Sequence, residues 1–352
     1  MTDEFKARIS AAGRTNAPLR IRGAGSKDWY GHALNGEILD TRSHAGIVAY
    51  EPTELFVTAK CGTPLAEIET VLAQKGQCLP FDAPRFSPTS TIGGVVAAGL
   101  SGPRRVSAGS LRDFVLGVDI LDGEARALRF GGQVMKNVAG YDVSRLIAGS
   151  LGTLGLITEV TLKVLPVPVA EVTLRFELNQ GDALDKLNRW AGQPLPIVAS
   201  AWHDGVLTLR LGGARAAVEA AQLKLGGEKV GADATAFWRD CRDQALPFFA
   251  AERLWRLSVP SVAPPLALPG EQWIEWGGAL RWLRSDSPAE TIRAAAHQAG
   301  GSATLYRAPA ALKAQVGAFA PLSAPLLKLH RNLKAAFDPK GIFNPGRLYP
   351  EF

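Results

Sequence analysis

Three glycine-dense segments in the first half of the chain constrain its fold more than any other feature. Each stands at the end of an expected strand or helix: 22–26 (Arg-Gly-Ala-Gly-Ser), 90–94 (Ser-Thr-Ile-Gly-Gly) and 149–155 (Gly-Ser-Leu-Gly-Thr-Leu-Gly). Glycine allows a close approach of the main chain to a ligand and lets successive N–H groups point into one concavity. One such segment alone is better explained as a tight turn. The three together, with Arg22, predict a site where main-chain amides bind the diphosphate of an extended nucleotide cofactor.

Several common catalytic and nucleotide-binding motifs are absent from the sequence. It contains no Gly-Lys-Ser/Thr of a phosphate-binding P-loop, no His-Glu-x-x-His and no Gly-x-Ser-x-Gly. A Rossmann fingerprint is also excluded, because Asp28 stands at its third glycine position and no amphipathic helix begins there. The histidines are scattered, so we expect no metal site: His32, His44, His203, His297 and His330.

Length and composition indicate two globular domains. The chain has 352 residues, of which 47% are hydrophobic and 20% charged. Its net charge of +6 is spread along the sequence without a basic run, which argues against nucleic-acid binding. Three cysteines without Cys-x-x-Cys spacing (Cys61, Cys78, Cys241) favour reduced thiols and argue against an iron–sulfur cluster held by this chain.

The sequence also predicts where the protein works in the cell. Residues 1–5 lack the basic and apolar regions of a signal peptide. The longest clean apolar run, 92–100, is too short to cross a bilayer. We therefore expect a cytoplasmic protein, with any inner-membrane association made through partners.

Short strands dominate the expected structure of the first half. Residues 47–50 and 55–59 have the composition of buried strands, and 115–121 and 127–130 flank Asp122-Gly123 as a hairpin. Residues 157–164 alternate cleanly and end at Pro166. One helix is expected after Thr63 as N-cap, with Leu65, Ile68 and Leu72 on its buried side.

The second half alternates strands, hairpins and helices, which predicts an α+β domain with an antiparallel sheet covered by helices. The expected strands are 172–178, 198–202, 206–211, 253–259, 274–283 and 303–307, and the expected helices are 183–190, 214–225 and 289–298. A last helix begins near Pro321, carries Leu322, Leu326, Leu329 and Leu333 on one stripe, and runs to Phe337. We place the domain limits at 1–168, 169–320 and 321–352, the last segment returning to the first domain.

A series of motifs resembles a known family along essentially the whole chain. They are Arg22-Gly-Ala-Gly-Ser26, Glu51-Pro-Thr-Glu-Leu55, Thr91-Ile-Gly-Gly94, Gly109-Ser-Leu-Arg-Asp113, Lys136-Asn-Val-Ala-Gly-Tyr-Asp142, Gly152-Thr-Leu-Gly-Leu-Ile-Thr158 and Phe337-Asp-Pro-Lys-Gly-Ile-Phe-Asn-Pro-Gly346. This pattern is similar to the FAD-binding domain of the vanillyl-alcohol oxidase/p-cresol methylhydroxylase (PCMH) superfamily. Within it, the motifs most resemble the family of smaller FAD-binding subunits of bacterial glycolate oxidase (glycolate dehydrogenase).

The resemblance implies a fold of two α+β subdomains that bind FAD, followed by a smaller α+β cap domain with an antiparallel sheet. It also implies which residues bind FAD. The pyrophosphate would lie against Arg22, Gly23, Ala24, Gly25 and Ser26 and against Thr91, Ile92, Gly93 and Gly94. The flavin side would be supported by Gly109, Ser110 and Asp113, and the adenine and ribose end would be lined by Gly152, Thr153, Gly155 and Ile157. Asn344 would return to the isoalloxazine edge. Covalent members carry a histidine after the first glycine loop, where this chain has Ser26, so we expect non-covalent FAD.

The sequence departs from the hydroxy-acid-oxidising members, which the resemblance associates with a cluster of histidines and a glutamate in the cap. Here His203 stands alone in an expected turn, where a solvated histidine is the simpler interpretation. Arg281 is a candidate catalytic residue that could grip a substrate carboxylate in a bidentate pair. Packing of Arg281 against the neighbouring tryptophans explains its position equally well.

The resemblance therefore implies an FAD-dependent oxidoreductase that acts on CH–OH groups as a subunit of a glycolate dehydrogenase. Because the histidine cluster is absent, we expect this subunit to relay electrons, or to complete the assembly, between a larger FAD-containing subunit and an iron–sulfur subunit. Two alternatives stay open. One is a self-sufficient FAD dehydrogenase of another small hydroxy acid, and the other is a non-catalytic assembly subunit with structural FAD.

Overall fold

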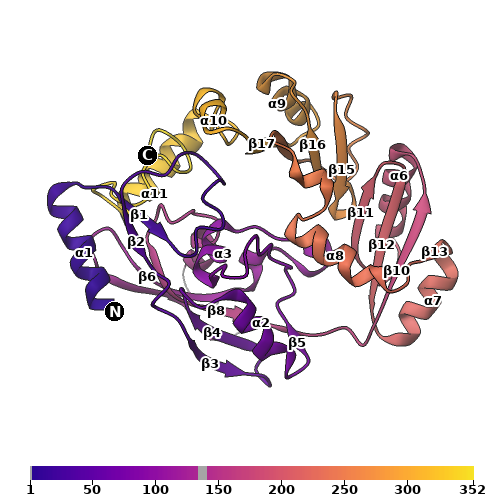
Figure 1. The fold of residues 1–352 in the computed structure, drawn as a ribbon, viewed down its shortest axis with the longest axis horizontal. Coiled ribbons are helices and arrows are strands. Elements are labelled where there is room, and N and C mark those ends of the chain that lie inside the picture. The colour runs from indigo at the N-terminus through magenta and orange to yellow at the C-terminus, as the bar shows by residue number, and fades with distance from the viewer. Residues whose placement is uncertain (1, 134–140) are drawn as a thin grey trace. The chain divides into compact units, whose positions relative to one another are not determined.

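The computed structural model of the chain describes residues 2–133 and 141–352 (Figure 1). Residue contacts divide it into two compact units. The first unit comprises Met1–Leu100, Ser110–Pro166 and Pro321–Phe352, and the second comprises Ser101–Gly109 and Val167–Ala320. Each unit has its own sheet and its own core, so each is described separately.

A five-stranded sheet forms the centre of the first unit, with strand order β3-β4-β8-β6-β7 and antiparallel pairing throughout. Its strands are β3 (Ile47–Glu51), β4 (Phe56–Lys60), β6 (Val115–Leu121), β7 (Ala127–Gly131) and β8 (Leu156–Lys163). The expected hairpin around Asp122 is confirmed by the pairing of β6 with β7. The long alternating strand β8 lies at the centre, between β4 and β6.

A second small layer of the first unit holds the start of the chain. Strands β1 (Leu19–Arg22) and β2 (Glu37–Asp40) pair in parallel. Helix α1 (Thr2–Thr15), which the sequence analysis did not predict, buries Phe5 and Ile9 against Leu19, Leu39 and Phe343. The short strands β5 (Gln77–Cys78) and β9 (Leu165–Pro166) pair with each other and are the remaining described strands of this unit.

The helices of the first unit are short except at the chain ends. Besides α1 they are α2 (Leu65–Ala73), α3 (Ile92–Ala98), α5 (Val143–Ile147), α11 (Ala324–Phe337) and the 3-10 turn η1 (Leu111–Phe114). The expected buried side of α2 is confirmed, because Leu65, Ile68 and Leu72 are at most 1% exposed. Thr63 does not cap α2; its hydroxyl instead donates to the Lys60 carbonyl at 2.7 Å.

The second unit is built on an eight-stranded antiparallel sheet, ordered β13-β10-β12-β11-β15-β16-β14-β17. The strands are β10 (Ala170–Glu177), β11 (Ile197–His203), β12 (Val206–Gly213), β13 (Glu228–Lys229), β14 (Leu254–Ser258), β15 (Glu271–Glu275), β16 (Leu280–Arg284) and β17 (Ser302–Arg307). The helices are α4 (Arg105–Ala108), α6 (Gln180–Ala191), α7 (Arg215–Leu225), α8 (Asp233–Asp243), α9 (Ala289–Gln298) and α10 (Ala310–Val316), with 3-10 turns η2 (Pro247–Ala250) and η3 (Trp276–Gly278). This is the helix-covered antiparallel sheet that the sequence predicted.

The two faces of this sheet differ in chemistry, because successive strand residues point to opposite sides. On one face, α6 packs on Leu207 and Leu209, α7 packs on Leu174 and Leu211, and the core against α9 includes Leu283. The strand pairings place polar, charged and aromatic side chains on the other face: Arg175, Thr208, His203, Trp273, Glu275, Trp282 and Arg256.

Two further expectations for individual elements are wrong. The single strand expected over 274–283 is interrupted by η3, where Trp276 and Gly277 adopt left-handed backbone angles (φ 53° and 64°), so β15 turns back to pair with β16. The leucine stripe of the last helix is not its buried side. Leu326 and Leu329 are 48% and 53% exposed, and the only buried residue of α11 is Lys334.

No helix in the described residues is both long and apolar enough to cross a bilayer. The cysteines Cys61, Cys78 and Cys241 form no disulfide.

Candidate cofactor-binding site

A narrow cleft in the first unit brings together four segments that are far apart in the sequence. It has a volume of about 90 Å³ and is lined by residues 21–28, by Leu34, by Thr91, Gly94, Ala97 and Ala98, by Leu151, and by Asn344 and Arg347. Eight of the residues predicted to bind FAD are among them: Arg22, Gly23, Ala24, Gly25, Ser26, Thr91, Gly94 and Asn344. The volume is below that usual for a whole drug-sized ligand, so the cleft suits one compact polar part of a larger molecule.

Two glycines of the first loop lie in positions that a larger residue could not occupy without movement. Gly25 has φ +72°, in the left-handed region, and a Cβ there would meet the Arg22 guanidinium. A Cβ on Gly23 would meet the Thr91 hydroxyl. The loop therefore approaches the second glycine segment closely, with bare main chain at the cleft.

The C-terminal Asn-Pro-Gly segment holds two walls of the cleft together through one side chain. Asn344 Oδ1 accepts from the Ile21 amide at 2.9 Å, and its Nδ2 donates to the Leu151 carbonyl at 2.7 Å. The Asn344 main-chain amide donates to the Leu19 carbonyl at 2.9 Å. Asn344 thus positions the glycine loop, since its amide oxygen and nitrogen both bond to the chain itself.

A buried ion pair fixes this tail segment. Lys334 Nζ lies 2.7 Å from Asp338 Oδ2 and also donates to the carbonyls of Thr153 (2.8 Å) and Phe343 (2.7 Å). Asp338 accepts from the amides of Ile342 and Phe343 at 3.1 and 2.8 Å. Burial lowers the pKa of Lys334, and Asp338 opposes that shift. Helix α11 therefore contributes to the site through a buried charge and not through its leucines.

The cleft carries more positive than negative charge. Arg20 and Arg22 both bind the carboxylate of Asp28, the latter from Nε at 2.9 Å. Arg347, 5% exposed, donates to the carbonyls of Lys27 and Asp28 at 3.0 Å each, and burial lowers its pKa to about 10. One carboxylate thus faces several cations, an arrangement that favours an anionic ligand.

Sequence reasoning missed three charged residues of this cleft, Lys27, Asp28 and Arg347, and five apolar ones: Ile21, Leu34, Ala97, Ala98 and Leu151. Lys27 and Asp28 directly follow the predicted loop, so extending the motif by two residues would have included them. Arg347 follows the Asn-Pro-Gly motif directly. Nothing in the sequence alone indicates that its guanidinium reaches a loop more than 300 residues away.

Other predicted residues do not line the cleft. The Gly93 amide donates to the Cys61 carbonyl at 2.8 Å, and Ile92 is fully buried. A Cβ on Gly152 would meet Asn344 Nδ2 at 2.7 Å, and one on Gly155 would meet the Leu121 carbonyl at 2.9 Å. Thr153 and Ile157 are buried (1% and 5% exposed).

The predicted segment 109–113 makes its own local structure. Ser110 and Asp113 form a reciprocal capping box on η1, in which the Ser110 amide and hydroxyl donate to Asp113 Oδ2 at 2.9 and 2.7 Å. Gly109, with φ +112°, ends α4. Of the motif 136–142, residues 136–140 lie outside the described residues, and Asp142 caps α5 by accepting from the Arg145 amide at 3.2 Å.

In the second unit, the candidate catalytic residue Arg281 is 1% exposed and faces the chain itself. Its Nε donates to the Gly278 carbonyl at 3.1 Å, its Nη1 to Pro264 at 2.5 Å and its Nη2 to Ala263. Burial lowers its pKa to about 10. These contacts bind the guanidinium to main-chain carbonyls, on the sheet face opposite Trp273 and Trp282, whereas a carboxylate clamp needs guanidinium edges that are free to meet a ligand.

A buried carboxyl group lies on the opposite face of the same sheet. Glu275 is 3% exposed, and its Oε1 accepts from the indoles of Trp273 and Trp282 at 3.0 and 3.1 Å. Burial raises its pKa to about 7 despite these hydrogen bonds. Trp273 and Trp282 therefore pack around one buried polar group.

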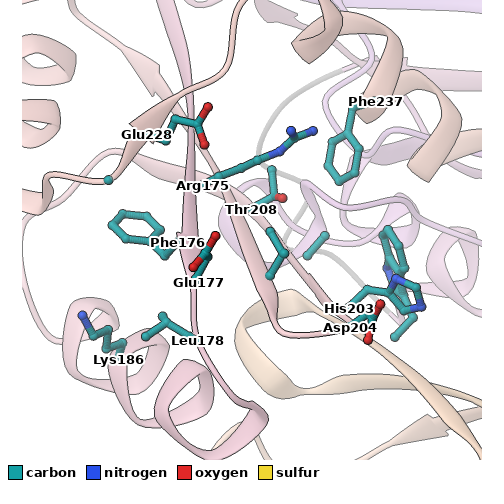
Figure 2. Close-up of a pocket in the computed structure, with 14 residues that line it drawn as sticks. Arg175, Phe176, Glu177, Leu178, Lys186, His203, Asp204, Thr208, Glu228 and Phe237 are labelled. Atoms are coloured by element: carbon teal, nitrogen blue, oxygen red, sulfur yellow. The ribbon is translucent and has the colours of Figure 1, made fainter.

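The second unit also has an open cavity of about 790 Å³, shown in Figure 2. Its wall includes Arg175, Glu177, Thr208 and His203 from neighbouring strands, and Phe237 from α8. His203 Nε2 lies 2.7 Å from Glu271 Oε1, and its ring contacts Trp273 at 5.1 Å between centroids. In the part of the chain that the structure describes, no three His, Cys, Asp or Glu side chains gather to form a metal site.

Comparisons with protein families and structures agree with this geometry. Residues 1–131 match a model described as an FAD binding domain, and residues 321–348 match one described as the C-terminal domain of FAD linked oxidases. A solved structure of alkyldihydroxyacetonephosphate synthase aligns over 97% of this chain and 75% of its own, with a TM-score of 0.67 and 17% identity, which shows a shared fold. The chain is an FAD-dependent oxidoreductase of the FAD-linked oxidase class.

One relative matches almost end to end. Glycolate oxidase subunit GlcE of Escherichia coli is 50% identical over 344 residues, 97% of this chain and 96% of its own. Glycolate oxidase subunit GlcD of Bacillus subtilis is 31% identical over 49% of this chain and 37% of its own. A D-lactate dehydrogenase of Archaeoglobus fulgidus is 28% identical over 47% and 37%. The chain belongs to the family of FAD-binding glycolate oxidase subunits within the PCMH-type superfamily.

The residues of the cleft fit part of this cofactor. Its glycine positions leave no room for a Cβ, and its charged groups include more cations than carboxylates. That combination of donors suits a diphosphate.

Proposed function

We propose that this chain is the FAD-binding subunit of a multi-subunit glycolate (2-hydroxy acid) dehydrogenase, in which it relays electrons between a larger FAD-containing subunit and an iron–sulfur subunit. The observation that carries the proposal is the 50% identity to a glycolate oxidase subunit over nearly the whole of both chains. When bound, FAD supplies a group that accepts and releases electrons.

In this proposal the first unit holds the FAD diphosphate between residues 22–26 and the Thr91–Gly94 segment. Asn344 and the Lys334–Asp338 pair keep those loops in place from the C-terminal side. The flavin is bound non-covalently in this proposal, because Ser26 stands where covalent members carry a histidine. The Ser26 hydroxyl accepts a hydrogen bond from Ser90 Oγ at 2.9 Å. Acid precipitation should release all of the yellow colour into the supernatant.

The relay assignment draws on the position of the histidines as well as on the sequence. His44 contacts Phe5 near α1, His203 pairs with Glu271, and His330 packs on Tyr349 and Phe352. These three histidines are thus held in separate local structures, whereas the resemblance associates substrate oxidation in hydroxy-acid-oxidising members with a histidine cluster.

Co-purification from the native host followed by anaerobic titration tests the proposal. The tagged chain should bring down a larger flavoprotein and an iron–sulfur protein, and glycolate should bleach the flavin absorbance of the complex. The isolated, FAD-loaded chain should stay yellow with glycolate. Rapid bleaching of the isolated chain would contradict the relay and indicate a self-sufficient dehydrogenase. A flavin that no partner can reduce would indicate a structural cofactor.

A further inference from the structure

We propose that Lys27 is a phosphate-binding residue of the cofactor cleft, supplying a side-chain ammonium in addition to the main-chain amides of the glycine loop. This inference rests on the part of the proposed function that places the FAD diphosphate in the cleft, and it is independent of the substrate. It also extends the expectation that main-chain amides bind the diphosphate, since the sequence analysis did not include Lys27 in the site.

The surroundings of Lys27 explain why its charge is available. It lines the cleft, and its Nζ lies 3.5 Å from Ser26 Oγ and 5.6 Å from the centre of the Phe86 ring. The adjacent carboxylate, Asp28, is already bound by two arginines. No carboxylate within salt-bridge distance of Lys27 occurs among the described residues, so a cation stands beside the glycine loop without an anion to neutralise it.

Burial makes this unpaired charge costly. Desolvation lowers the pKa of Lys27 to about 8, with no acidic neighbour raising it. An anionic ligand at the loop would stabilise the protonated amine and raise that pKa again. By linkage, FAD then binds the protonated form more tightly, and its affinity falls as the pH rises through the pKa of the free protein.

The other charged groups around Lys27 are carboxylates and guanidinium groups. Asp28, Arg20 and Arg22 face it from its own loop, and Arg347 reaches its carbonyl from the C-terminal tail. On the Phe86 side, Arg85 pairs with Glu69. Carboxylates and guanidinium groups ordinarily change charge well outside pH 7–9, so a change of affinity in that interval reports an amine.

Titration of the FAD-free full chain with FAD, followed by quenching of flavin fluorescence, tests the role. For the unmodified chain the Kd should rise about tenfold between pH 7 and pH 9. Lys27→Met should weaken binding at pH 7 by at least about tenfold and remove the pH dependence. Lys27→Arg should restore affinity without the pH dependence, because a guanidinium stays charged over this range.

Lys75→Met, an exposed lysine of the same unit, serves as the control and should bind FAD as the unmodified chain does. A pH-independent Kd for the unmodified chain, or unchanged affinity in Lys27→Met, would overturn the role of Lys27. If Gly25→Val lost FAD binding while Lys27→Met bound FAD with normal affinity, the cleft would still be the diphosphate site, but Lys27 would not contribute to it. Normal FAD binding in both variants would mean that the diphosphate does not bind in this cleft, and that part of the proposed function would fail as well.

Discussion

The cofactor cleft of the first unit and the sheet of the second unit use charged residues in opposite ways. In the cleft, two arginines share one carboxylate and Lys27 has none, so positive charge is left over for a ligand. In the second unit, Arg281 is engaged by main-chain carbonyls and Glu275 by two indoles. A buried charge that the chain has already satisfied is evidence for packing, whereas one that it leaves unsatisfied indicates a ligand.

The largest expected effect comes from Gly25→Val, which tests whether the cleft depends on bare main chain. A β-branched residue at φ +72° is strained, and its Cβ would also meet the Arg22 guanidinium. We expect FAD to be absent from the purified protein. The control is Gly76→Val, where φ is +63° but no atom lies within 4 Å of the added Cβ. Equal loss of FAD in both variants would mean that backbone strain alone is responsible.

Lys334→Met is expected to have the next largest effect, on stability. Removing one partner of a buried, hydrogen-bonded ion pair leaves Asp338 buried without its cation, at a cost of about 3–5 kcal/mol. Thermal unfolding monitored with and without FAD should show a lower midpoint in both cases. Lys328→Met, on an exposed position of α11, should leave the midpoint unchanged. An unchanged midpoint in Lys334→Met would show that the tail is held by other contacts.

Glu275→Gln should change how the stability of the second unit depends on pH. Because the folded-state pKa of Glu275 is raised from 4.5 to about 7, the folded protein binds the proton more tightly, and stability is lost as pH rises through this interval. Glutamine stays neutral, so the variant should be more stable at pH 8, by up to about 3 kcal/mol. Denaturant unfolding at pH 5 and pH 8 measures this difference. The exposed Glu228→Gln is the matched control, and an equal pH slope in all three proteins would refute the assignment.

The smallest effect is expected for His203→Gln. The His203–Glu271 pair is partly exposed, and such pairs contribute about 0–1 kcal/mol. The variant should unfold within about 1 kcal/mol of the parent and bind FAD with the same Kd. A clear loss of glycolate-driven flavin reduction in the assembled complex would instead give this histidine a catalytic role and weaken the contrast between the two units.

The sequence predicted those parts of the molecule that depend on local chemistry. Strand alternation located β8, the apolar spacing of α2 located its buried side, and the glycine segments indicated the loops that now line the cleft. The contributions of Arg347 and Lys334 could not be predicted in this way. Each depends on contacts with distant segments, such as the Lys27 carbonyl and the Thr153 carbonyl.

The two errors described for individual elements have different physical origins. The apolar stretch around Trp276 has the composition of one continuous strand, yet two glycines after it allow a left-handed turn. The leucines of α11 have the spacing of a buried stripe, but the buried ion pair at Lys334 determines which side of the helix faces inward. At α11 a tertiary ion pair therefore overrides a periodic pattern, whereas at Trp276 a local glycine turn interrupts one.

The short segment Ser101–Gly109 has a practical consequence for anyone who wishes to divide this protein. It groups with Val167–Ala320, and Trp276 Nε1 donates to the Gly102 carbonyl at 2.9 Å while Arg105 stacks on the same indole. If the chain were cut after residue 166, the C-terminal fragment would lack Ser101–Gly109, and Trp276 would lose its contacts with Gly102 and Arg105. Expression of isolated halves should therefore yield misfolded protein unless 101–109 is grafted back onto the C-terminal fragment, for example through a circular permutation.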